Sequence, residues 1–177
     1  MINDFSIKYE KFLELTTNYN LIPIYKEIIF DLETPVSTFM KINKGDYSFL
    51  LESVSGGEMI ARHSFLGSSP SLVFISEKNK IKIIKDQKFL QEYESKNPID
   101  ELRKYIKAYI PYIDDSLPPF SGGAVGYFSY DSIRYIENIP ENNPSEIGLQ
   151  DIFFIFTDSI IIFDHVLKTI KIVYNLF

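Results

Sequence analysis

The segment from Ile152 to Phe163 limits the possible folds of this chain more than any other. Aromatic and aliphatic residues stand at consecutive positions from Phe153 to Phe156 and again from Ile160 to Phe163. A strand with one face in water alternates apolar and polar residues, whereas a strand covered on both faces does not. The pattern therefore predicts one central strand, buried on both sides, and a fold built around a sheet.

Local signals divide the rest of the chain into short elements. Thr34 caps a predicted helix whose first position is Pro35, and Asn97 and Pro98 have the same roles in a second helix. A loose helical period predicts a further helix near the N-terminus. Strands are predicted at residues 21–29, 47–54, 59–67, 71–76, 80–85 and 169–174. Roughly eight strands with three or four flanking helices predict an α+β fold with a large, mostly antiparallel β-sheet or sandwich.

Composition excludes several classes of function. The formal net charge is −6, from 18 basic and 24 acidic side chains, whereas a general nucleic-acid-binding protein needs a basic surface. There is no cysteine and only two histidines, so disulfides and Cys-rich or His-rich metal sites are not expected. No stretch reaches the ~20 apolar residues that span a bilayer, and the charged N-terminus does not match a signal peptide. We therefore expect a cytoplasmic protein that binds neither nucleic acid nor membrane.

Three other patterns each allow more than one interpretation. The glycine-rich segment 122–126 lacks the GxGxxG and Gly-Lys-Ser/Thr motifs, so it marks either a close backbone approach or a ligand cradle. No serine lies in a GxSxG elbow, so a triad of Ser121, Asp131 and His165 is not expected. Asp164 and His165 stand at a predicted hairpin end, where aspartate commonly bonds turn backbone, although a metal or catalytic role is the alternative. The aromatic fraction of 15% suits a core or an aromatic-lined pocket.

The polar pair Glu52-Ser53 ends an apolar, aromatic run. Because side chains alternate along a strand, Leu51 and Ser53 share one face and Glu52 lies on the other. If residues 56–57 form a tight hairpin turn, Leu51 pairs with Arg62. A hydroxyl and a guanidinium beside an apolar surface suit a small ligand with an apolar body and a polar end. An ordinary hairpin that faces solvent would show the same pattern.

Six segments of the chain, in this order, resemble the N-terminal region of anthranilate synthase component I. They are LIPIYKEI (21–28), DLETPVS (31–37), SFLLESV (48–54), RHSFLG (62–67), GGAVGYFSYD (122–131) and IFDH (162–165). The resemblance covers residues 8–175 and departs from the family pattern at His63, where the family often has tyrosine.

The resemblance implies an activity and its partners. The family adds ammonia from a glutamine amidotransferase subunit (component II) to chorismate and eliminates pyruvate, giving anthranilate for tryptophan synthesis, with the assistance of Mg²⁺. The family's chorismate and magnesium ligands lie in a C-terminal domain whose motifs this chain does not match. The resemblance thus implies that residues 1–177 are a single N-terminal regulatory domain of a longer protein, without a catalytic residue or cofactor of its own.

The family's feedback inhibitor, L-tryptophan, binds between the N-terminal and C-terminal parts. Its Leu-Glu-Ser motif maps onto Leu51, Glu52 and Ser53. The resemblance implies that Ser53 faces the ligand, that Glu52 meets its ammonium group, and that Arg62 and His63 flank the rim. In a regular strand Glu52 and Ser53 would point to opposite faces, so either the strand ends there, or a bulge intervenes, or one of the two residues acts through its backbone.

Two alternatives stay open. Aminodeoxychorismate synthase component I shares the fold and the amidotransferase partnership, although segment 31–37 and the Leu-Leu-Glu-Ser string favour the anthranilate enzyme. The other alternative is a stand-alone module that senses an aromatic amino acid or docks onto another protein.

Overall fold

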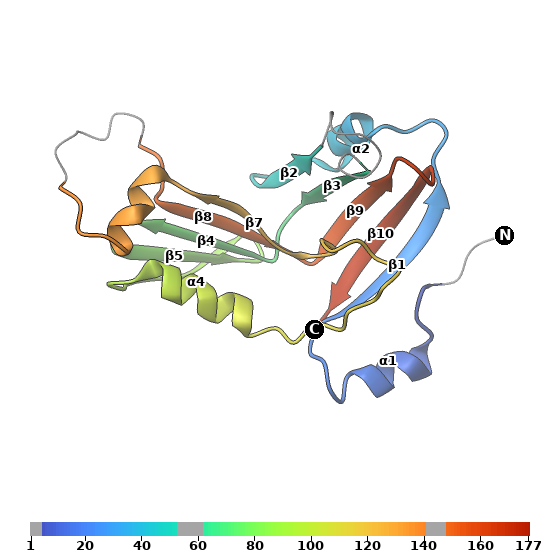
Figure 1. Cartoon of the computed structure of the whole chain (residues 1–177), viewed down its shortest axis with the longest axis horizontal. Helices are drawn as coiled ribbons and strands as arrows, with labels where there is room; N and C mark the ends of the chain where they lie inside the picture. The colour runs from blue at the N-terminus through green and yellow to red at the C-terminus, as the bar shows by residue number, and fades with distance from the viewer. Residues whose placement is uncertain (1–4, 53–61, 141–147) are drawn as a thin grey trace. The chain divides into compact units, whose positions relative to one another are not determined.

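The computed structural model describes residues 5–52, 62–140 and 148–177 (Figure 1). The chain divides into two compact units, each with its own five-stranded sheet. Unit 1 comprises residues 1–70, 109–123 and 157–177, and unit 2 comprises residues 71–108 and 124–156. The predicted α+β class is confirmed, with the strands divided between two sheets.

Unit 1 holds the segments in which the site was predicted. Its sheet has the order β1-β10-β9-β3-β2, and every pair in it is antiparallel. The strands are β1 (Ile22–Ile29), β2 (Ser48–Leu51), β3 (His63–Ser68), β9 (Ser159–Asp164) and β10 (Thr169–Leu176). Helix α1 (Tyr9–Leu15) also belongs to this unit.

One face of this sheet carries the core of unit 1. Leu66, Phe163 and Ile170 are buried there, and Phe39 and Ile42 of helix α2 (Pro35–Ile42) pack against them. Helix α2 therefore covers this face beside β2 and β3 (Figure 1).

Unit 2 contains the second sheet, with the order β6-β5-β4-β8-β7. Its strands are β4 (Leu72–Glu77), β5 (Lys80–Lys85), β6 (Lys88–Glu94), β7 (Gly123–Phe128) and β8 (Ile152–Thr157). Helix α4 (Pro98–Lys107) packs on one face, since the ring of Tyr105 meets the buried ring of Phe74 edge-on at 5.8 Å between centroids. A 3₁₀ helix, η1 (Tyr130–Tyr135), follows β7.

The two predicted helix starts are confirmed. The hydroxyl of Thr34 accepts a hydrogen bond from the backbone N–H of Ser37 (3.0 Å), and the Ser37 hydroxyl accepts one from the N–H of Thr34 (2.9 Å). This reciprocal pair satisfies two N–H groups that have no partner within the helix. At α4, the side-chain oxygen of Asn97 accepts from the N–H of Asp100 (3.3 Å). No helix within the described ranges is long and apolar enough to cross a membrane.

The prediction of one continuous strand from Ile152 to Phe163 is wrong. The run is broken at Asp158 into β8 and β9, which belong to different sheets. The backbone carbonyl of Asp158 accepts hydrogen bonds from the backbone N–H (2.7 Å) and the side-chain amide (3.3 Å) of Asn175. Each half is an interior strand with consecutive buried residues, so the expected burial on both faces is confirmed for both.

The glycine-rich segment contains two close approaches. A Cβ on Gly126 in β7 would lie 1.9 Å from the carbonyl oxygen of Phe153 in β8. A Cβ on Gly122 would lie 2.3 Å from the side-chain nitrogen of Asn175. The interpretation of these glycines as sites of close packing is therefore confirmed.

Candidate functional site

The predicted site residues lie around the connection between β2 and β3 in unit 1. Leu51 is the last residue of β2, and Glu52 follows it; both are exposed. Arg62 immediately precedes β3, and His63 is the first residue of that strand. Ser53 and the predicted tight turn at residues 56–57 lie outside the described residues.

The predicted pairing of Leu51 with Arg62 is wrong. Leu51 pairs with Phe65, three positions further along β3, and Phe49 pairs with Gly67. The ring of Phe49 occupies the space above Gly67, where a Cβ would lie 2.3 Å from a ring carbon. This packing favours the observed register. By strand alternation Leu51 shares its face with Phe65 and His63.

Aromatic side chains line this face of β2 and β3. The ring of Phe120 lies 5.3 Å from that of Phe65 and 6.4 Å from that of Phe49, measured between centroids. The His63 ring lies 5.9 Å from the Phe65 ring. The face beside Leu51 is therefore lined by tilted and edge-on rings, a surface that suits a flat apolar group.

Asp164, the last residue of β9, is the polar centre of the site. Its Oδ2 accepts hydrogen bonds from Nε (3.0 Å) and Nη2 (2.6 Å) of Arg62. Its Oδ1 accepts the backbone N–H groups of Val166 (3.0 Å) and Leu167 (2.9 Å). The turn role predicted for Asp164 is confirmed, but its bond to Arg62 was missed. The two residues are 102 positions apart, and only the pairing of β3 with β9 brings them together.

These contacts control the charge of the cluster. Burial alone would raise the pKa of the Asp164 carboxyl, but the hydrogen bonds from Arg62, Leu167 and Val166 outweigh it and lower the pKa to about 2. The same pair raises the pKa of Arg62. Burial lowers the pKa of His63, although its Nε2 lies 3.5 Å from Oδ2 of Asp164, whose charge opposes that shift. At neutral pH the site therefore holds an ionised Asp164–Arg62 pair beside a neutral His63.

Acidic pH is expected to lower the stability of unit 1, because it protonates the Asp164 carboxylate. Because the folded-state pKa lies below the unfolded value of 3.8, the contribution of this carboxylate is complete above about pH 5 and is lost as the pH falls toward 2. The shift corresponds to about 2 kcal/mol. Urea unfolding at pH 6 and pH 3 is expected to show about half of this loss in the native chain, since pH 3 still lies above the folded-state pKa of about 2, and a smaller loss in Asp164→Asn. The exposed control Asp31→Asn should behave like the native chain, and equal pH dependence in all three proteins would refute the assignment.

Two other kinds of site, a Ser-His catalytic pair and a metal site, are not supported by the structure. His165 Nε2 lies 2.7 Å from the hydroxyl of Ser64, but Ser64 is completely buried and the His165 ring packs against the rings of Phe30 and Phe163. A substrate could not reach this serine. Within residues 5–52, 62–140 and 148–177, no group of three or more His, Asp or Glu side chains could hold a metal ion.

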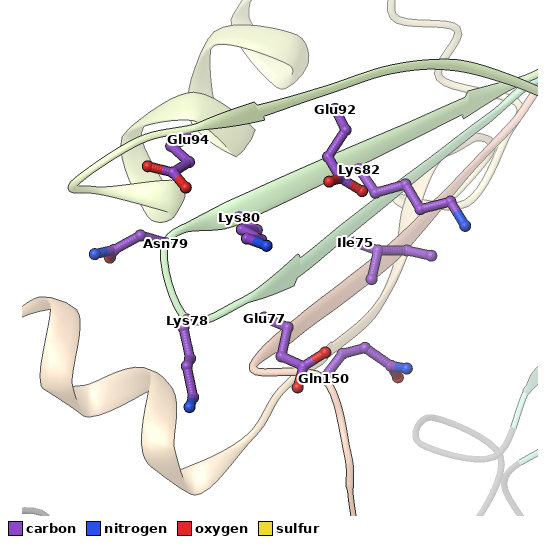
Figure 2. Close-up of a pocket in the computed structure, with 9 residues that line it drawn as sticks. All are labelled: Ile75, Glu77, Lys78, Asn79, Lys80, Lys82, Glu92, Glu94 and Gln150. Carbon is purple, nitrogen blue, oxygen red and sulfur yellow. The ribbon is translucent and has the colours of Figure 1, made fainter.

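A shallow pocket of about 620 Å³ lies on the sheet of unit 2 (Figure 2). Its charged side chains are three lysines and three glutamates, all exposed, so their charges cancel. An exposed surface with balanced charge is typical of the solvated face of a sheet. The lining residues are Ile75, Glu77, Lys78, Asn79, Lys80, Lys82, Glu92, Glu94 and Gln150.

Comparison with known proteins gives relatives along nearly the whole chain, although no protein-family model matches it. Anthranilate synthase component 1 of Aquifex aeolicus is 37% identical over 173 residues, which cover 97% of this chain and 35% of that protein. The chain is a relative of anthranilate synthase component I. The enzyme of that name from Acetivibrio thermocellus is 41% identical over 166 residues, or 92% of this chain and 33% of that protein.

The fold agrees with the sequence relationship. The crystal structure of anthranilate synthase component I from Streptococcus pneumoniae matches 83% of this chain with a TM-score of 0.52 and 28% identity, and the match covers 31% of that structure. The chain thus spans about a third of the length of the anthranilate synthase component I relatives that it matches. The predicted resemblance is confirmed by both comparisons.

Proposed function

We propose that residues 1–177 are the N-terminal, non-catalytic domain of a cytoplasmic anthranilate synthase component I. The observation that supports this most is the similarity over 97% of the chain to only 35% of the Aquifex aeolicus enzyme. The reaction converts chorismate to anthranilate and pyruvate with ammonia from a glutamine amidotransferase subunit. We place the chorismate and magnesium sites in the two thirds of the relatives that this chain does not match.

The role of this domain is to form part of a feedback site for L-tryptophan at the connection between β2 and β3. A free amino acid presents an ammonium group, a carboxylate and, in tryptophan, an indole ring. Glu52 is exposed at the end of β2 and supplies a negative charge for the ammonium group. The apolar face that begins at Leu51 suits the indole, and Ser53 supplies a hydroxyl. Arg62 and His63 flank the rim, where the half-exposed guanidinium suits a carboxylate.

Feedback inhibition from this site depends on the rest of the enzyme. An effector inhibits only if it binds one arrangement of the protein more tightly than another. This domain alone would therefore bind tryptophan weakly and would consume no chorismate.

The experiment begins with the gene sequence after codon 177 and expression of the whole product. Anthranilate fluorescence with chorismate, ammonium and Mg²⁺ then measures activity as L-tryptophan is added. Glu52→Gln and Ser53→Ala are each expected to raise the tryptophan concentration for half-inhibition about tenfold, which equals about 1.4 kcal/mol of binding free energy. Glu94→Gln, an exposed glutamate of unit 2, serves as the matched control and should change nothing.

Other outcomes would point to the alternatives. A native enzyme that tryptophan does not inhibit would contradict the feedback site. Formation of aminodeoxychorismate would identify the related synthase instead. A gene that ends at codon 177, with a product that binds tryptophan and leaves chorismate intact, would indicate a stand-alone module.

A further inference from the structure

Arg62 is held through both its side chain and its backbone, and both contacts come from residues at the end of β9. Its side chain donates two hydrogen bonds to Oδ2 of Asp164. Its backbone carbonyl accepts the N–H of His165 (2.8 Å). Arg62, the residue directly before β3, is therefore attached to the turn between β9 and β10.

The carboxylate that holds Arg62 is itself immobilised. Asp164 is 5% exposed, and its second oxygen is occupied by the backbone N–H groups of the following turn. Burial and four accepted hydrogen bonds leave this side chain little freedom to change rotamer. Asp164 thus transmits the rigidity of the β9–β10 turn to the guanidinium of Arg62.

Among the described residues, Asp164 is the only side chain that accepts hydrogen bonds from Arg62, so part of the guanidinium stays available. A guanidinium has five N–H donors, and the two bonds to Asp164 use one on Nε and one on Nη2. The side chain remains 41% exposed. Lys171, the cationic residue of β10, is paired with Glu27 at 3.3 Å. His63 is kept neutral by burial, so Arg62 is the main partner of Asp164 in this cluster.

We propose that Asp164 is a positioning residue of the effector site, which holds Arg62 so that its free donors meet the carboxylate of the bound amino acid. This inference rests on the feedback site proposed above. A surface arginine normally loses rotamer freedom when it binds a ligand, and an arginine that is already held avoids that cost. Asp164 therefore improves affinity for the effector without touching it.

The test uses the whole gene product and L-tryptophan as the probe, with half-inhibition of anthranilate formation as the measurement. Asp164→Asn keeps the shape of the side chain and removes its charge, and it should raise the half-inhibiting concentration about tenfold. In an Arg62→Gln background the same change should have no further effect, because Asp164 acts through Arg62. A purely structural role would instead add its full effect in both backgrounds.

A second probe separates the carboxylate from the rest of the ligand. Tryptamine lacks that group, so calorimetry should show equal tryptamine affinity in the native protein and in Asp164→Asn. If Asp164→Asn does not fold, as judged by thermal melting, Arg62→Lys provides the same test, since lysine keeps the charge but not the two-donor geometry. Arg62→Lys should then weaken the binding of tryptophan and leave the binding of tryptamine unchanged.

The outcomes separate the two claims. If tryptophan does not inhibit the native enzyme, the proposed feedback site is wrong, and this inference is wrong with it. The other outcomes overturn only the positioning role, provided that tryptophan inhibits the native enzyme. They are that Asp164→Asn leaves the half-inhibiting concentration unchanged, that it raises this concentration equally in the Arg62→Gln background, or that it weakens tryptamine binding as much as tryptophan binding.

Discussion

Phe163→Ala is expected to lower the free energy of unfolding by about 3–5 kcal/mol, the usual cost of removing a buried aromatic ring. Phe163 is completely buried in β9, in the core with Leu66 and Ile170. Its ring meets that of Phe30 edge-on, at 5.1 Å between centroids. The truncation removes these contacts and leaves a cavity beneath the strand that ends in Asp164. Urea unfolding followed by far-UV circular dichroism measures the loss.

A matched aromatic control is available on the surface. Phe89 in β6 is 63% exposed, so Phe89→Ala should change the free energy of unfolding by less than about 0.5 kcal/mol. A Phe163→Ala variant as stable as Phe89→Ala would show that the core of unit 1 does not lie where the structure places it. Because Asp164 follows Phe163 directly, we also expect Phe163→Ala to weaken the proposed inhibition of the whole enzyme by tryptophan.

Gly126→Ala is expected to cost about 3 kcal/mol, the upper end for overpacking, and more if the sheet cannot adjust. An added Cβ would lie 1.9 Å from the carbonyl oxygen of Phe153 and 2.7 Å from the Cα of Phe154. Both are backbone atoms of the neighbouring strand β8, so no side-chain rotation can relieve the contact. Strand β7 would have to separate from β8, and thermal melting of the variant should show the loss.

The control for this substitution is Ala124→Ser in the same strand. Ala124 already carries a Cβ and is partly buried, so one added hydroxyl should change the melting temperature only slightly. If Gly126→Ala melted at the same temperature as Ala124→Ser, the close approach of β7 and β8 would be refuted.

Local sequence patterns were sufficient for the elements whose causes are local. Thr34 and Asn97 cap their helices through N–H groups three residues away, so the cap and its partner stand in one short segment. Strand alternation placed Leu51 at the end of an apolar run and at the edge of the candidate site. The same patterns could not give the β2–β3 register, because it depends on how the ring of Phe49 packs against Gly67.

The polar part of the candidate site shows the same limit. Arg62 was a predicted rim residue and Asp164 a predicted turn residue, but nothing local connects positions 102 residues apart. Their ion pair exists because β3 lies beside β9 with His63 opposite Asp164. Strand order depends on long-range packing, so sequence patterns identified both residues without showing that they meet.

The run from Ile152 to Phe163 shows what the sequence determines by itself and what only the tertiary structure determines. Its consecutive apolar residues determined by themselves that the segment is buried on both faces, because exposing either face to water would be unfavourable. Only the tertiary structure decided that it forms two strands, since the backbone of Asp158 is bound by Asn175 from β10. Hydrophobicity specifies that a segment is buried, whereas hydrogen-bonding partners distant in sequence specify which sheet it joins.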